Sequence, residues 1–204
     1  MPVKRQPDLT RQRLIEAAFE EMHRFGFRSA SLESILKDTN VTKGALYHHF
    51  RNKTELGYAV VDEVLKPWVE QRWKPIIEAE NPIDAALNVL KNRLEETTDE
   101  MISLGCPLNN LCQEMSGIDA GFQERLNSIV CSWRDGIAMA MRRGQENGSV
   151  RADADPEGCA AFIVGSIEGC MGMAKASQDH AILYKGMTGL AQFLESLRPA
   201  KRTH

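Results

Sequence analysis

The sequence TKGALYHHF, residues 42–50, predicts one short helix around which the rest of the chain is organised. Thr42 is a suitable N-cap, because its hydroxyl can accept a hydrogen bond from a backbone N–H that has no partner in the first helical turn. Leu46 and Phe50 lie on one apolar side and are expected to be core. Lys43 points elsewhere, so this helix can both pack against the protein and contact a partner.

A second short helix is predicted just upstream, over residues 31–36, where apolar residues recur at helical spacing. The turn 39–41 joins the two helices, and Asn40 lies where the turn needs a positive φ, which asparagine tolerates better than most residues. Two helices joined by such a turn form a helix-turn-helix. The second helix of that motif can enter the major groove of DNA.

A bracing helix is predicted before this motif, over residues 9–25, and Gly26 ends it. Its apolar face has four members at helical spacing: Leu14, Ala18, Met22 and Phe25. Residues 1–8 are polar and are expected to form a flexible arm.

A linking helix is predicted after the motif, beginning at Lys53 with Asn52 as its N-cap. The free amides at its start and the adjacent lysine suit a DNA phosphate. Arg28, in the loop after the bracing helix, could reach a phosphate or be only a solvated arginine. Pro67 should kink or end the linking helix.

The composition predicts an all-α protein. Hydrophobic residues make up 43% of the 204 residues and charged residues 26%, and alternating β-branched runs are scarce. No apolar run approaches the roughly 20 residues that span a bilayer, so a cytoplasmic protein without membrane contact is expected. The five cysteines include no CxxC pair, so neither a disulfide framework nor a metal site is indicated. No cofactor is expected.

Charge is divided unevenly along the chain. Residues 1–56 hold ten Lys and Arg against seven Asp and Glu, whereas the other 148 residues hold 15 against 21. Such an asymmetry is expected when a small domain contacts DNA and a larger one does not. We therefore expect a DNA-binding domain over residues 1–52 and a larger domain over residues 53–204 that does not contact DNA, to which the glycines, the apolar cavity and the resemblance described below assign dimerisation and ligand binding.

Five more helices are predicted in the second domain, which makes about nine in total. They cover about residues 82–105, 107–115, 119–147, 156–177 and 180–197. Asn81-Pro82 and Asp155-Pro156 each combine an N-cap with proline at the first helical position.

The helix over residues 156–177 contains three interior glycines. Each lowers helix stability by about 1 kcal/mol relative to alanine, so their presence requires an explanation. They are Gly165, Gly169 and Gly172. Close approach of a helix from a second subunit is the expected reason, and a homodimer would match a palindromic DNA site. Packing against the chain's own long helix is the alternative.

An apolar effector cavity is predicted where the faces of four helices meet. Its expected lining residues are Trp68, Trp73, Leu94, Met101, Phe122, Ile129 and Trp133. A solid core is the alternative, because aromatic and methionine stripes more often serve packing than ligand binding.

Residues 32–56, together with the bracing helix and the helical remainder, resemble the DNA-binding domain of the TetR family of transcriptional regulators. The resemblance implies a homodimeric regulator, usually a repressor, that binds a pseudo-palindromic operator. A small molecule in its C-terminal domain would release it from DNA. Three positions depart from the usual pattern: Leu36 and Thr39 replace small alanines, and Asn40 replaces the turn glycine.

Contacts with double-stranded DNA are expected from seven residues: Arg28, Thr42, Lys43, Gly44, Tyr47, His48 and Lys53. Gly44 should allow a close approach, and Lys53 should hold a phosphate. Tyr47 could instead be only a packing aromatic, and Lys43 only a solvated charge.

The segment 105–111 resembles a TetR branch that includes repressors answering to electrophiles and oxidants. This resemblance makes Cys106 a candidate redox sensor and Lys175 its possible charged or covalent partner. Cys106 also precedes a helix start, where the helix dipole favours thiolate over thiol. The alternative is an ordinary packed cysteine that reacts no faster than the others.

Two other classes of function compete with a ligand-gated regulator. An enzyme has little support, because no phosphate-binding glycine loop or GxSxG motif occurs, and the adjacent His48 and His49 face different ways on a helix. A non-gated structural DNA-binding protein would need basic charge over much of its surface.

Overall fold

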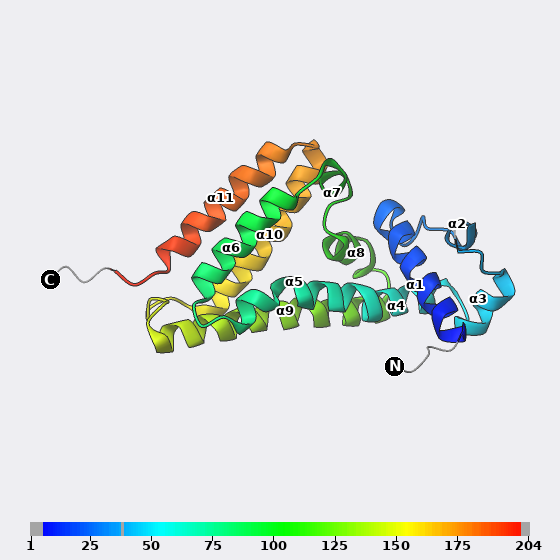
Figure 1. Ribbon diagram of the computed structural model, residues 1–204, viewed down its shortest axis with the longest axis horizontal. Helices are drawn as coiled ribbons and strands as arrows, with labels where there is room; N and C mark the ends of the chain where they lie inside the picture. Colours follow the sequence, from blue (N-terminus) through cyan, green and yellow to red (C-terminus); the bar gives the residue numbers. More distant parts are fainter. Residues whose placement is uncertain (1–5, 38, 201–204) are drawn as a thin grey trace. The chain divides into compact units, whose positions relative to one another are not determined.

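The structure is a computed structural model that describes residues 6–37 and 39–200. Within these residues every regular element is a helix and no strand occurs, which confirms the all-α prediction (Figure 1). The elements are α1 (Gln6–Phe25), α2 (Leu32–Lys37), α3 (Lys43–His49), α4 (Lys53–Val60), the π-helical turn η1 (Val61–Leu65), α5 (Lys66–Glu78), α6 (Pro82–Glu96), α7 (Asp99–Leu104), α8 (Pro107–Met115), α9 (Ala120–Asn147), α10 (Pro156–Ser177) and α11 (His180–Ser196).

The chain forms two compact units. The first unit comprises Met1–Trp68 and Pro107–Ser128, and the second comprises Val69–Cys106 and Ile129–His204. Each unit is built from discontinuous stretches, so the division of the chain at residues 52 and 53 stays a prediction.

The first unit begins with α1, which braces the helix-turn-helix. Three of the four residues on its predicted apolar face are buried: Leu14, Ala18 and Met22. The fourth prediction is wrong, because the Phe25 side chain is 60% exposed. Gly26, at φ 81°, ends the helix, and Phe27 beyond that turn enters the core instead, its ring centroid 4.7 Å from that of Phe122.

The start of α1 also differs from the expectation. The helix begins at Gln6, so the flexible arm predicted for residues 1–8 is wrong for residues 6–8. Pro7 is tolerated there because the first turn of a helix needs no N–H donor from it. Residues 1–5 lie outside the described residues.

The turn between α2 and α3 is held by its own side chains. Asn40 has a φ of 54°, as predicted. The Thr39 hydroxyl donates to the carbonyl of Leu36 at 3.0 Å, which ties the turn to the end of α2. The Thr42 hydroxyl accepts from the backbone N–H of Ala45 at 3.2 Å, which confirms the predicted N-cap of α3.

The linking helix starts as predicted and then continues further than expected. The Asn52 side chain accepts from the N–H of Glu55 at 2.9 Å and caps α4. The helical path passes through η1 into α5, so of the two outcomes predicted at Pro67, a kink or an end, the end is excluded. The π-helical turn just before Pro67 widens the backbone and accommodates the proline ring.

In the second unit, α10 lies side by side with α11, and α6 packs against α11 (Figure 1). The single helix expected over residues 82–105 is wrong, because the chain breaks into α6 and α7 at Thr97 and Thr98. The Thr98 hydroxyl accepts from the N–H of Met101 at 3.2 Å and starts α7 as a new helix. The predicted end at Gly105 is confirmed, with φ 70°.

Candidate functional site

The surface of α3 carries the residues predicted to contact DNA. Leu46 and Phe50 are buried, as predicted, and they anchor the helix to the first unit. The opposite side is open to solvent, where five of the predicted contact residues are exposed: Thr42, Lys43, Gly44, Tyr47 and His48. The Gly44 position has only the Thr42 hydroxyl near it, at 4.0 Å from where a Cβ would stand, so another molecule can approach its backbone closely. This surface has the form of a recognition helix.

Two further predicted DNA contacts, Arg28 and Lys53, lie next to each other. The Arg28 side chain is exposed, and Lys53 Nζ donates to the Arg28 carbonyl at 3.1 Å. The same ammonium stands 4.9 Å from the ring centroid of Phe27. Burial lowers the pKa of Lys53, an effect that Glu114 and Glu21 partly offset. In this geometry Lys53 orders the loop that carries Arg28, and its contact with a phosphate stays a prediction.

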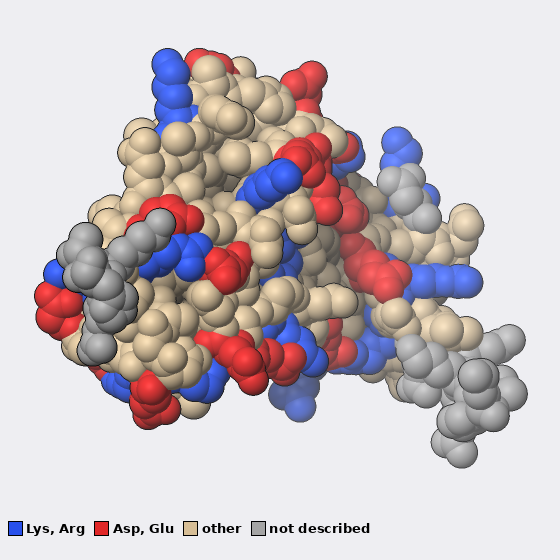
Figure 2. Space-filling view, turned by 60° about the vertical axis from the view of Figure 1, so that its left-hand side comes forward, with Lys and Arg blue, Asp and Glu red and all other residues tan. Residues whose placement is uncertain are grey.

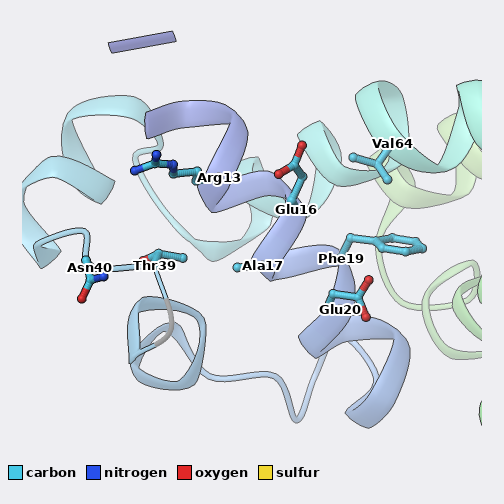
Figure 3. Close-up of a pocket in the computed structure, with 8 residues that line it drawn as sticks. All are labelled: Arg13, Glu16, Ala17, Phe19, Glu20, Thr39, Asn40 and Val64. Atoms are coloured by element: carbon cyan, nitrogen blue, oxygen red, sulfur yellow. The ribbon is translucent and has the colours of Figure 1, made fainter. Parts of the chain in front are cut away.

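A hollow of about 720 Å³ lies in the first unit between α1 and the turn of the helix-turn-helix (Figure 3). It is lined by Arg13, Glu16, Ala17, Phe19, Glu20, Thr39, Asn40 and Val64. Two carboxylates and one guanidinium share this lining with apolar groups. None of the residues predicted to bind an effector belongs to it.

The residues predicted to line an effector cavity belong to different units. Phe122 is 0% exposed and packs in the core of the first unit, its ring centroid 5.0 Å from that of Tyr58. In the second unit, the rings of Trp73 and Trp133 stack with centroids 4.5 Å apart. Leu94 and Met101 are half-buried on α6 and α7, and Ile129 is buried. Trp68 is half-buried at the end of the first unit.

Buried polar atoms surround the tryptophan pair, and the sequence analysis missed them. The Arg93 guanidinium lies 5.2 Å from the Trp73 ring centroid and donates to the Arg72 carbonyl at 3.4 Å. Among the described residues, Arg93 Nε and Trp133 Nε1 are buried donors without a hydrogen-bond acceptor. Buried donors of this kind normally have a partner, which distinguishes these two from the other polar groups of the second unit.

Cys106 lies beside a buried carboxylate in the second unit. Its Sγ donates to Glu168 Oε1 at 3.3 Å, and burial raises the pKa of Glu168. Burial lowers the pKa of Arg72, an effect that Cys106 and Glu96 partly offset. Lys175, the predicted partner, is half-buried in the last turn of α10. Glu168 could have been noticed in the sequence, because it is the one charged residue between Gly158 and Ala174, the long interior stretch of α10.

The predicted dimer residues lie on an open face of α10. A Cβ built on Gly165 or on Gly169 would meet nothing within 4 Å, so neither glycine serves close packing inside this chain. Phe162 and Met173 share that stripe at helical spacing and are 52% and 54% exposed. Gly172 is half-buried next to it. Exposed apolar stripes of this kind are typical of interaction surfaces.

Known proteins match this chain over most of its length. The family model described as bacterial regulatory proteins of the tetR family matches residues 14–60, and the tetracyclin repressor-like C-terminal domain matches residues 82–190. The transcriptional regulator AcuR of Cereibacter sphaeroides is 31% identical over 77% of this chain and 73% of its own. The HTH-type transcriptional repressor DhaR of Mycobacterium sp. is 24% identical over 87% of this chain and 88% of its own. A crystal structure of regulatory protein TetR from Rhodobacter sphaeroides has 27% identity and a TM-score of 0.78, covering 90% of this chain and 98% of that one.

Proposed function

Because the chain belongs to the TetR family of transcriptional regulators, we propose that it is a homodimeric repressor that binds a pseudo-palindromic operator and leaves it when an effector binds. Members of this family are DNA-binding regulators and not enzymes, which confirms the prediction of a DNA-binding regulator and the prediction that the chain is not an enzyme. The observation that carries the proposal is the exposed side of α3, which is anchored by buried Leu46 and Phe50. The name of the relative DhaR supports repression.

The open face of α10 supports the homodimer. The expectation that no apolar run is long enough to span a bilayer is wrong for α10, which passes by length and composition alone, yet only 39% of its most apolar window is buried within the chain. The apolar side chains and the two open glycines of this face need cover. A second copy supplies it and places two recognition helices on a twofold axis, as a palindromic operator requires.

Surface charge favours a gated regulator over a structural DNA-binding protein. The net charge of the chain is −3. Figure 2 shows acidic and basic side chains intermixed on one face, together with broad uncharged areas. A protein that coats DNA regardless of sequence needs a largely basic surface.

A regulator that contacts DNA does so in the cytoplasm, without a membrane partner.

Release from DNA would begin in the second unit, at the buried donors near the tryptophan pair or at Cys106. A small molecule with a hydrogen-bond acceptor would meet the buried donors of Arg93 and Trp133, and a reactive one would meet the Cys106 thiol beside Glu168 and Arg72. Either ligand releases DNA only by binding better to the form in which the two recognition helices no longer match successive grooves.

Operator binding is tested by footprinting on the DNA upstream of the protein's own gene, since regulators of this type often control their neighbourhood. We expect protection of two half-sites about one helical turn apart. Small molecules that remove this protection should also raise the melting temperature of the free protein. Uniform protection without half-sites would favour the structural DNA-binding protein.

Cys106 is expected to react with N-ethylmaleimide about tenfold faster than Cys159 and Cys170. Burial raises the pKa of both of these thiols, which lowers their thiolate fraction at neutral pH. Peptide mass spectrometry gives the rate at each cysteine, and the footprint gives release. Equal rates at all five cysteines, or release that persists in Cys106→Ser, would rule out the thiol switch in favour of a non-covalent ligand.

A further inference from the structure

The loop between α1 and α2 is held by a carboxylate from α8. Glu114 Oε2 accepts from the backbone N–H of Phe27, and Glu114 Oε1 accepts from the N–H of Arg28, both at 2.8 Å. The two oxygens of one side chain thus bind two successive amides across 86 and 87 residues of sequence. Charge-assisted hydrogen bonds of this kind are stronger than neutral ones.

Gly26 and Lys53 complete the arrangement around this loop. A Cβ on Gly26 would stand 2.8 Å from Glu114 Oε2, so a side chain at residue 26 would make this carboxylate shift. Lys53 Nζ donates to the Arg28 carbonyl. The backbone of Arg28 is therefore bound at its N–H by Glu114 and at its C=O by Lys53.

We propose that Glu114 is a positioning residue for operator binding, which holds the loop 26–28 so that Arg28 and Lys53 face DNA phosphates together. The inference rests on the proposed function, because it assigns these two cations to the operator. Glu114 itself need not touch DNA. Its negative charge near two cations would otherwise weaken phosphate binding, so its presence there calls for a structural benefit.

The position of Glu114 along the chain also makes it suitable for regulation. α8 runs from Pro107 to Met115 and carries Glu114 in its last turn. The residue before this helix is Cys106, whose thiol binds Glu168. Cys106 is therefore joined by one peptide bond to the helix that carries Glu114 at its other end.

The direction of the change in operator affinity distinguishes a positioning role of Glu114 from a purely electrostatic effect. Glu114→Ala removes a negative charge, and charge alone would tighten binding to DNA. We expect about tenfold weaker operator binding instead, together with a salt dependence reduced by about one phosphate contact. Glu124→Ala is the matched control, because Glu124 is an exposed carboxylate on α9 in the same unit. It should bind as well as the wild type or slightly better.

Glu114→Gln provides a second measurement of operator affinity that does not depend on the folding of the alanine variant. The amide has one acceptor oxygen for the two N–H groups, so its affinity should lie between those of the wild type and Glu114→Ala. Fluorescence anisotropy on the footprinted operator at several salt concentrations measures all four proteins, with circular dichroism as a check of folding. Tighter binding by either Glu114 variant, or binding equal to that of Glu124→Ala, overturns the inference alone. Failure of the wild type to bind any operator overturns the proposed function and the inference with it.

Discussion

Gly165→Arg is expected to weaken operator binding by about 100-fold, because it separates the two subunits and leaves each recognition helix to bind a half-site alone. A Cβ at this position meets nothing within 4 Å inside the chain, so the side chain of the arginine starts from open space in its own protomer. Replacing a glycine inside a helix should even stabilise α10. The loss would therefore come from the interface, where two guanidinium groups would meet across the twofold axis.

Sedimentation equilibrium measures whether the two subunits separate, and fluorescence anisotropy measures the resulting loss of operator affinity. The wild type should sediment at twice the protomer mass of 22.8 kDa, and Gly165→Arg at the protomer mass itself. Gly117→Arg is the matched control, since a Cβ there also meets nothing within 4 Å, but on the loop before α9. A dimeric Gly165→Arg protein with full operator affinity would show that this face of α10 is not the dimer interface.

Phe122→Ala is expected to lower the free energy of unfolding by about 3–5 kcal/mol, the usual cost of removing a buried phenylalanine. Phe122 is 0% exposed and contacts the rings of Phe27 and Tyr58. A Cβ on Gly57 would stand 2.7 Å from its ring, so the backbone of α4 approaches it closely.

Urea denaturation followed by circular dichroism measures this effect. Phe25→Ala removes the same atoms from a residue that is 60% exposed and should change the free energy of unfolding by less than about 0.5 kcal/mol. If the two variants were destabilised equally, Phe122 would not be the centre of the first unit's core.

The helix-turn-helix could be predicted from sequence because its determinants are local. Thr42 and Asn52 cap helices through amides three residues away, and Asn40 supplies the positive φ within the turn itself. Such signals depend on residues that are close in sequence. The break at Thr98 is equally local but was hidden by apolar residues that continue at helical spacing on both sides of it.

The contacts that organise the candidate sites could not be predicted, because they join distant parts of the chain. Glu114 binds amides 86 and 87 residues away, and Cys106 binds a carboxylate 62 residues away. Phe25 and Phe27 illustrate the same difficulty. Both are aromatic and both lie near the end of α1, and only the path of the chain after Gly26 decides which of them is buried.

The most direct test of the central claim is operator affinity after changing the exposed side of α3. Lys43→Ala combined with Tyr47→Phe removes a charge and a hydroxyl from the surface of that helix and leaves its buried anchor Leu46 unchanged. Anisotropy on the footprinted operator should show about 10–100-fold weaker binding and a salt dependence reduced by about one contact. Lys74→Ala, which removes an exposed lysine from α5, should leave both quantities unchanged. Operator affinity and salt dependence in the double variant equal to those of the wild type would contradict the assignment of α3 as the recognition helix.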